Sequence, residues 1–259
     1  RKSAKPSWMT TCWNSVKTLL SATATINPAE ISKKLYLKGE AMSDEEKLLK
    51  RLTAYLSDDQ HHTLRIYGHG ASGKSTFARK LQLALGEERA NLLETDPYVI
   101  TGEYRDLLSS KDFPHQKVTA CIPAVHELGS LERDICALRS GLDILTIGTA
   151  WSPSLRLSAR KPILIVEGMS AAFLPESLFD LSICFYTDDQ TELERRLARD
   201  VAVRERRPDW IEQTHLARRE QYSRFYQPYL ATADLIICQS GNGFLIEKDS
   251  PCYKKSSQE

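Results

Sequence analysis

Hydrophobic positions along this chain follow two different periods. From Met42 onward leucines recur at helical spacing, and from Thr63 short apolar runs alternate with stretches of helical periodicity. Such alternation is typical of a mostly parallel sheet with helices on both of its faces. The apolar runs predict strands over residues 64–67, 92–95, 143–147, 162–166, 181–186 and 235–238.

Helical periodicity fills the segments between these runs. One helix is predicted over residues 131–138, and a last one ends near Pro228. Between them, Thr187 and Gln190 match a capping box, which predicts the start of a further helix. Residues spaced by four give this helix a predicted buried face made of Leu193, Leu197 and Val201.

A glycine-rich segment follows the first predicted strand. Residues 68–76 match the phosphate-loop pattern G-x-x-x-x-G-K-[ST], and a helical pattern begins directly after them. Glycines let the backbone curl so that its N–H groups face phosphate oxygens, and the helix N-terminus adds a positive dipole end. The alternative is a plain turn between two elements, which the strand, loop and helix context disfavours. The predicted nucleotide contacts are Gly68, Gly70, Ala71, Ser72, Gly73, Lys74, Ser75 and Thr76.

Acidic residues stand at the ends of two further predicted strands. Asp96 follows the second strand, and Glu167 follows the continuous apolar run. Ligands of open α/β sheets gather at the carboxyl ends of the strands, so both carboxylates are expected beside the loop. There Ser75 and Glu167 would hold Mg²⁺, and Lys74 would neutralise the outer phosphates. Asp96 would accept the proton of an attacking hydroxyl. The alternatives are a turn-forming Asp96 before proline and a solvated Glu167.

Six arginines and no lysine lie between residues 195 and 207. Planar guanidinium groups fit phosphate oxygens and the charge of a transferring phosphoryl group. A helix that carries them beside a flexible connection predicts a lid over the nucleotide at about residues 195–210. The alternative is a solvated helix face paired with neighbouring acids.

Bulk composition narrows the class of protein without naming a function. The 259 residues carry a formal net charge of +1 and 41% hydrophobic residues, which is typical of a globular protein. The near-neutral charge and the lack of an aromatic-basic platform argue against nucleic acid as a partner. No apolar run approaches the roughly 20 residues of a membrane span, which argues against a membrane partner. Six cysteines without a C-x-x-C pair disfavour a zinc knuckle and favour a reducing, cytoplasmic setting.

Composition also divides the chain. The first 29 residues contain no acid and are rich in Lys, Ser and Thr, so residues 1–41 are interpreted as an N-terminal extension. Three interpretations of this extension compete: a disordered tail, a transit-like peptide, or sequence outside the natural protein. A further hypothesis is that natural translation begins at Met42. A nucleotide-binding domain is expected over residues 42–240 and a C-terminal tail over residues 241–259.

With these pieces assembled, the chain resembles the uridine kinase and phosphoribulokinase family of P-loop kinases. The matching segments are 68–76, 95–98, 163–168, 195–206 and 222–237. The resemblance implies a P-loop NTPase-type three-layer α/β sandwich with a five-stranded, mostly parallel sheet and a helical lid. It implies transfer of the γ-phosphoryl group of ATP, with Mg²⁺, to a hydroxyl group. On this resemblance Arg196 and Arg199 are catalytic lid arginines, and Arg199 and Arg204 contact the nucleotide.

The resemblance favours a nucleoside such as uridine or cytidine as the acceptor. Because the sequence departs from the family pattern, a sugar phosphate, pantothenate or nicotinamide riboside stays open as an alternative acceptor. The Asp-x-Phe-Tyr run of uridine kinases is shortened to residues 96–98, and Glu205 replaces a glycine between two lid arginines. The expected substrate contacts are Asp96, Tyr98, His126 and Trp151.

For two of these contacts, a structural role is the commoner interpretation. A lone Trp151 can stack on a base, but such a residue is more often part of the packing, and His126 is more often a hydrogen-bonded structural residue. Outside the enzyme class, the alternative is a nucleotide-binding regulatory module without acceptor chemistry. The sequence does not identify the oligomeric state, and a homo-oligomer is compatible with it.

Overall fold

The computed structural model describes residues 42–58 and 60–250, so the expectations for residues 1–41 lie outside the described part of the chain. The strands are β1 (His62–Gly68), β2 (Ala90–Glu94), β3 (Ile144–Leu145), β4 (Arg156–Leu157), β5 (Ile163–Glu167), β6 (Leu181–Tyr186), β7 (Leu235–Cys238) and β8 (Leu245–Asp249). The α-helices are α3 (Asp44–Tyr55), α4 (Lys74–Leu85), α5 (Gly102–Arg105), α6 (Leu128–Arg139), α7 (Asp189–Arg204) and α8 (Pro208–Gln221). Shorter helical segments are η1 (Asp96–Tyr98), η2 (Pro123–Val125), η3 (Met169–Phe173), η4 (Glu176–Leu178), η5 (Tyr222–Tyr226) and η6 (Gln227–Thr232).

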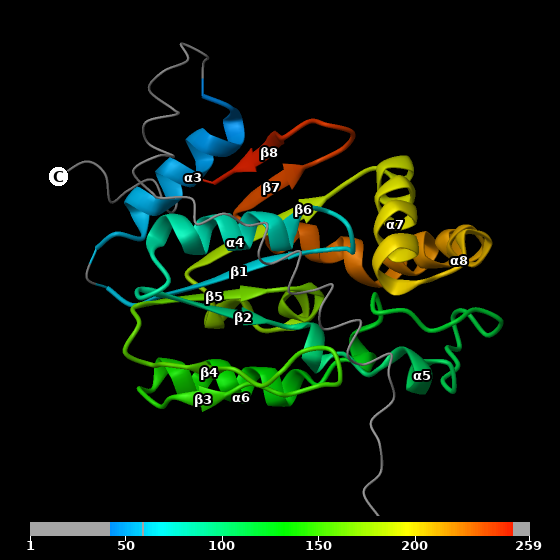
Figure 1. Cartoon of the computed structure of the whole chain (residues 1–259), viewed down its shortest axis with the longest axis horizontal. Helices are drawn as coiled ribbons and strands as arrows, with labels where there is room; N and C mark the ends of the chain where they lie inside the picture. Colours follow the sequence, from blue (N-terminus) through cyan, green and yellow to red (C-terminus); the bar gives the residue numbers. More distant parts are fainter. Residues whose placement is uncertain (1–41, 59, 251–259) are drawn as a thin grey trace, which may run out of the picture. The chain divides into compact units, whose positions relative to one another are not determined.

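The main sheet has six strands in the order β2-β5-β1-β6-β7-β8 (Figure 1). The first five are parallel, which confirms the predicted mostly parallel sheet, and β8 runs antiparallel to β7. Because β8 lies within residues 241–259, the prediction that a tail begins at residue 241 is wrong. The run at 143–147 forms β3, which pairs only with β4 in a separate two-stranded sheet.

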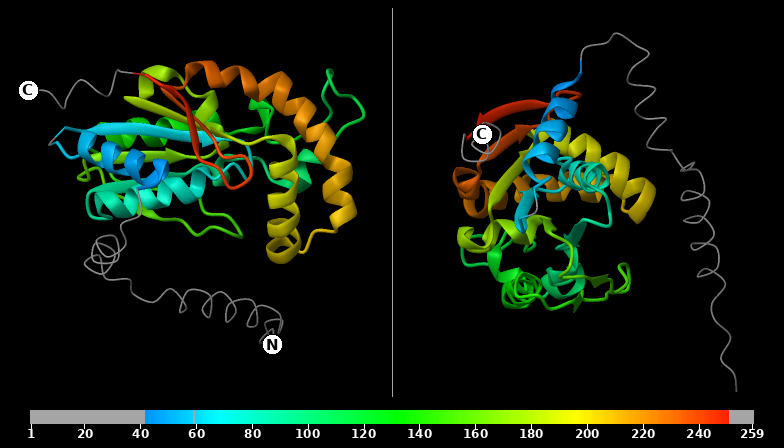
Figure 2. Two further views of the ribbon diagram at one scale, coloured as in Figure 1. Left: turned by 90° about the horizontal axis from the view of Figure 1, so that it is seen from above. Right: turned by 90° about the vertical axis from the view of Figure 1, so that its left-hand side faces the viewer.

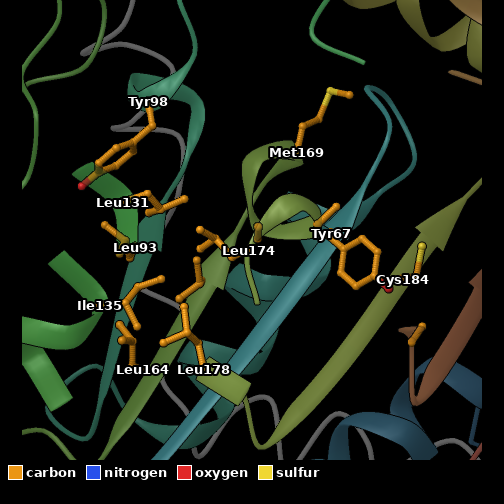
Figure 3. Packing of buried hydrophobic residues seen from close by; sticks show 14 of the residues in the cluster. Tyr67, Leu93, Tyr98, Leu131, Ile135, Leu164, Met169, Leu174, Leu178 and Cys184 are labelled. Atoms are coloured by element: carbon orange, nitrogen blue, oxygen red, sulfur yellow. The ribbon is translucent and has the colours of Figure 1, made fainter. Parts of the chain in front are cut away.

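Helices cover both faces of the main sheet, as Figures 1 and 2 show. Helices α3 and α4 pack on one face through a core that includes Leu52 and Phe77. Helix α6 packs on the other face, where Figure 3 shows Leu131 and Ile135 near Leu164 of β5. Strand β5 is buried at every position, as its continuous apolar run predicts. No helix in the described part of the chain has both the length and the apolar character needed to cross a membrane.

Helix α7 begins one residue later than the capping-box pattern predicts. The N-cap is Asp188 rather than Thr187, and its carboxylate accepts a hydrogen bond from the backbone N–H of Thr191 at 2.7 Å. Aspartate is as good an N-cap as threonine, and its negative charge also suits the positive end of the helix dipole. The predicted pairing of Thr187 with Gln190 is therefore wrong.

The buried face of α7 is charged rather than apolar. The predicted apolar face is half-buried at Leu193 and Leu197, and Val201 is 40% exposed. The side chains that are buried instead share the same spacing of four and are Glu192, Arg196 and Asp200. Buried charges require partners, which helix α8 supplies for Glu192 and Arg196, whereas Asp200 pairs with Arg199 of α7. The prediction of an apolar buried face is therefore wrong.

Candidate active site

The phosphate loop joins β1 to α4 at the carboxyl end of the sheet. Gly73 has a φ of 92°, in the left-handed region that favours glycine, and a Cβ there would lie 1.7 Å from Oε1 of Gln239. Gly68 is equally constrained, because a Cβ there would lie 2.0 Å from the carbonyl oxygen of Phe185. Helix α4 begins at Lys74, so its first N–H groups face the loop. The geometry is that of an anion-binding turn.

Glu167 brings the loop together with the end of β5. In the sheet it pairs in register with both β1 and β2, and its carbonyl oxygen accepts from the N–H of Thr95 at 2.7 Å. Its carboxylate accepts from the hydroxyl of Ser75 at 2.9 Å and lies 3.6 Å from Nζ of Lys74. The lysine and serine of the loop therefore meet the predicted carboxylate at one point.

Asp96 lies near this point on the neighbouring strand end. Burial raises the pKa of Glu167, Lys74 and Ser75 oppose the rise, and the charge of Asp96 adds to it. Asp96 is therefore close enough to Glu167 for their charges to interact. Its carboxylate is exposed and accepts no hydrogen bond from any residue that the structure describes. This placement leaves Asp96 available to a hydroxyl of a bound molecule.

The oxygen atoms of Ser75 and Glu167 suit Mg²⁺, which prefers hard oxygen ligands. Within residues 42–58 and 60–250, no group of three or more His, Cys, Asp and Glu side chains could hold a metal ion unaided. A Mg²⁺ held here would take its other ligands from phosphate oxygens and water, as this ion commonly does. When bound, the ion would neutralise negative charge on the phosphates.

Arg195 of α7 fixes the loop rather than facing a ligand. Its guanidinium donates to the carbonyl oxygens of Ala71, Gln239 and Gly241 at 3.2, 2.8 and 2.8 Å. Ala71 has a φ of 65°, a strained conformation for a residue with a side chain. The Arg195 contacts join this strained part of the loop to the connection between β7 and β8.

Arg196 and Arg199, the predicted catalytic arginines, contact their own helix and α8. Arg199 Nε donates to Asp200 at 2.7 Å, and Arg196 lies 3.3 Å from the ring of His215. Burial lowers the pKa of Arg196 to about 10. No described contact joins either guanidinium to the loop, so their catalytic role stays a prediction. The side chain of Arg204 lies outside the described part of the chain.

Two predicted acceptor contacts point into the protein. The hydroxyl of the fully buried Tyr98 bonds to Asp134 of α6 at 2.5 Å. The ring nitrogens of His126 bond to the hydroxyl of Ser170 at 2.7 Å and to the carbonyl oxygen of Ala120 at 2.9 Å. With these partners, we assign both side chains to packing rather than to the acceptor.

Trp151 is placed differently from these two residues. It lies in the connection between β3 and β4 and is 59% exposed. Its ring is therefore accessible, and its role as an acceptor contact stays a prediction.

A buried ionic group beside the loop was not predicted. Glu192 of α7 accepts from Nε of Arg218 and from Nη1 of Arg219, both at 2.9 Å, and lies 3.5 Å from Nδ1 of His69. Burial raises the pKa of Glu192, but the facing His69 ring, Arg218 and Arg219 outweigh this effect and hold the pKa below its usual range. We call Glu192, Arg218, Arg219 and His69 the ionic cluster. The only signal for it in the sequence was a cluster of arginines, and that pointed to α7 rather than to α8.

His69 links the loop to the start of α7 as a neutral ring. Its Nε2 accepts from the N–H of Thr187 at 2.9 Å, and its Nδ1 donates to the carbonyl oxygen of Gly70 at 2.9 Å. One acceptor and one donor define the neutral tautomer. Burial lowers the pKa of His69 to about 4, and burial has the same effect on His126.

We expect the free energy of unfolding to fall as the pH is lowered from 6.5 to 5. The unfolded chain binds protons at these two histidines near pH 6.5, whereas the folded chain binds them only near pH 4, so protonation favours unfolding. Their stabilising effect is complete above pH 6.5 and falls by about 2 kcal/mol per histidine by pH 5. Urea denaturation at pH 7, 6 and 5 measures the change.

Variants separate this effect from general acid sensitivity. His126→Asn should remove about half of the pH dependence between pH 6.5 and 5. His115→Asn, at an exposed position, should leave the pH dependence unchanged. A wild-type unfolding free energy that stays constant over this range would contradict the neutral, buried assignment.

The fold, the phosphate loop and the acids at the strand ends together define a P-loop nucleotide-binding protein. The chain belongs to the Phosphoribulokinase / Uridine kinase family, whose sequence model matches residues 64–243. Members of this family are ATP-dependent kinases, and this chain is therefore an ATP-dependent kinase. The resemblance found in the sequence is confirmed.

Individual relatives agree with this family and with the fold. A uridine kinase from Clostridium perfringens is 28% identical over 187 residues, which cover 68% of this chain and 86% of the relative. The structure of D-glycerate 3-kinase from Cryptococcus neoformans matches with a TM-score of 0.54 over 80% of this chain and 100% of that chain. The structure of phosphoribulokinase from Rhodobacter spheroides matches with a TM-score of 0.51 over 70% of this chain and 71% of that chain. The identities of 11% and 15% to these two structures support the fold alone.

Proposed function

We propose that this protein transfers the γ-phosphoryl group of ATP to a hydroxyl group of a small molecule. The observation that carries the proposal is the meeting of Lys74, Ser75 and Glu167 at the carboxyl ends of β1 and β5. Asp96 lies within electrostatic reach of this point and has an exposed carboxylate. A phosphate-binding turn, metal-binding oxygens and a free carboxylate are the groups that phosphoryl transfer requires.

The proposed step assigns a role to each of these groups. The acceptor oxygen attacks the γ-phosphorus and forms a new O–P bond, while its proton passes to the carboxylate of Asp96. The bond between the γ-phosphorus and the β,γ-bridging oxygen breaks, and ADP leaves with the electron pair. Lys74 and the N–H groups of the loop stabilise the charge that develops on the phosphate oxygens.

A nucleoside is the acceptor that similarity favours. The relative described above is named a uridine kinase, and its alignment covers most of its own length. The exposed ring of Trp151 is suited to stacking on a nucleobase. We therefore propose uridine or cytidine as the first acceptors to test.

One observation favours an anionic acceptor as the second candidate. Nε of Arg105 in α5 is buried and has no hydrogen-bond partner among the described residues. Burial lowers the pKa of Arg105, the charge of Arg218 adds to this effect, and Asp96 opposes it, which places Arg105 near the candidate base. A guanidinium with an unused donor suits a carboxylate or a phosphate, as in pantothenate or a sugar phosphate.

A panel of acceptors tests the proposal. Uridine, cytidine, nicotinamide riboside, pantothenate and sugar phosphates are each incubated with Mg-ATP, and ADP release and product mass are recorded. We expect ADP and a product heavier by one phosphoryl group with at least one acceptor. ATP binding without turnover of any acceptor would favour a regulatory module instead.

An Arg105→Ala variant separates the two acceptor classes in the same panel. If the acceptor is anionic, the variant should raise its KM and leave the KM for ATP unchanged, because the paired charge is lost. If the acceptor is a neutral nucleoside, the KM for that nucleoside should change little.

A further inference from the structure

The ionic cluster holds a guanidinium against the phosphate loop. Glu192 is 1% exposed, and its two carboxylate oxygens are bound by Arg218 and Arg219 of α8. Because Arg218 donates to Glu192 through Nε alone, its two terminal guanidinium nitrogens are left for other acceptors. In the described part of the chain, no oxygen or nitrogen accepts a hydrogen bond from Nη1 or Nη2 of Arg218. The Arg218 side chain is 18% exposed, and neither terminal nitrogen is among the fully buried polar atoms that lack a hydrogen-bond partner.

Gly70 shows where the free end of Arg218 lies. A Cβ placed on Gly70 would come within 2.7 Å of Nη2 and 3.7 Å of Cζ of Arg218. Gly70 is the third residue of the loop, well before Gly73 and the start of α4. Because the helix end binds the inner phosphates, the first half of the loop lies toward the outer end of the triphosphate. The guanidinium therefore lies beside the expected position of the γ-phosphate.

The two arginines of the cluster differ in their carboxylate partners. Arg218 and Arg219 are cations, Glu192 is the anion that they share, and the neutral ring of His69 adds no charge. Arg219 has a second carboxylate partner, because its Nε lies 3.0 Å from Asp189, whereas Arg218 pairs with Glu192. A bound anion would give the two terminal nitrogens of Arg218 a partner, and the nearest expected anion is the phosphate chain of ATP.

We propose that Arg218 is a catalytic residue whose guanidinium contacts the transferring phosphoryl group, and that Glu192 is the positioning residue that aims it. The inference rests on the proposed phosphoryl transfer. As the bond to the acceptor oxygen forms and the bond to ADP breaks, negative charge spreads over the oxygens of the γ-phosphoryl group. A fixed cation beside those oxygens lowers the barrier, as arginine residues do in other phosphoryl-transfer enzymes.

The arginines of α7 are less well placed for this role. Arg195 is bound to three backbone carbonyl groups of the loop and the β7–β8 connection. Arg196 and Arg199 contact His215 and Asp200 within the helix pair. Among the arginines with described side chains in α7 and α8, only Arg218 lies against the loop with both terminal guanidinium nitrogens free of a described acceptor. Arg219 shares Glu192, pairs through Nε with Asp189 at 3.0 Å, and lies over the ring of Tyr222.

The test compares Arg218→Ala with Arg219→Ala. With saturating ATP and the acceptor that turns over fastest in the panel, Arg218→Ala should lower kcat by about 10³-fold, within the range for a catalytic arginine. Its Kd for ATP, measured by calorimetry, should change by less than about threefold, because the contact strengthens in the transition state. Arg219→Ala removes the same kind of ion pair but should lower kcat less than about tenfold.

Two further variants keep the test independent of folding. Arg218→Gln retains most of the volume and a donor toward Glu192, and it should show the same loss of kcat with an unchanged melting temperature. Gly70→Ala should also lower kcat, because its Cβ displaces the guanidinium while the backbone, which lacks a positive φ there, tolerates alanine. Free guanidinium ion should partly restore the rate of Arg218→Ala but not that of Arg219→Ala.

The outcomes are distinct. The inference is overturned, and the cluster is structural, if Arg218→Ala and Arg218→Gln keep kcat within tenfold of the wild type. It is also overturned if Arg218→Ala and Arg219→Ala lower kcat equally. A wild-type chain that phosphorylates no acceptor contradicts the proposed function and the inference together. An active wild type with an active Arg218→Ala contradicts the inference alone.

Discussion

Replacing Lys74 with alanine should lower the rate of phosphoryl transfer by at least about 10³-fold while the fold is retained. Nζ of Lys74 lies 3.6 Å from Glu167, beside the loop, and the side chain is only 10% exposed. In such a site a point charge acts on the phosphates with little screening by water, so its loss is severe. Steady-state kinetics give the rate, and circular dichroism and thermal melting report the fold.

Lys80 provides the matched control for this variant. It lies in the same helix α4, but its side chain is exposed and pairs with Glu45 of α3. Lys80→Ala should change the rate by less than about twofold, since exposed ion pairs contribute little. ATP consumption by Lys74→Ala at the wild-type rate would show that the triphosphate binds elsewhere.

Replacing Asp96 with asparagine should lower acceptor turnover by about 10² to 10⁴-fold, the range for loss of a general base. The amide keeps the size of the carboxylate but cannot accept the proton of the acceptor hydroxyl. ATP affinity should be unchanged, because no described contact joins Asp96 to the phosphate loop. Measurement of kcat with the acceptor, together with calorimetric titration of ATP, separates the two effects.

The control for this variant is Asp112→Asn, an exposed carboxylate farther along the chain that should leave both quantities unchanged. If Asp96→Asn kept the wild-type turnover, Asp96 would be a turn former only. The N–H of Tyr98 does bond to the carbonyl oxygen of Thr95 at 3.0 Å, so the turn exists in either case.

The parts of the fold that could be predicted from sequence are those with a local physical cause. Strands β6 and β7 begin and end at the predicted residues, because short apolar runs bounded by polar residues leave few alternatives. The phosphate loop was predictable because its glycines are required by backbone geometry at Gly68 and Gly73. Parallel strand ends then bring Glu167 to Ser75, although 92 residues separate them.

The remaining features depend on partners far away in the chain. Strand β8 has a mixed sequence and lies at the edge of the sheet, where one neighbour is missing and the apolar pattern weakens. The charged face of α7 is stable only because Arg218 and Arg219 lie opposite Glu192. Tyr98 bonds to Asp134, which comes from a different helix. No local periodicity reports such pairings.

The most direct measurement is a crystal structure of the protein with Mg²⁺ and a non-hydrolysable ATP analogue. We expect phosphate oxygens bound by the N–H groups of residues 70–76 and by Lys74. We also expect Mg²⁺ at the hydroxyl of Ser75, with Glu167 bound to it directly or through water. An analogue whose phosphates lie away from the loop, or a metal ion that contacts neither Ser75 nor Glu167, would contradict the assigned nucleotide site.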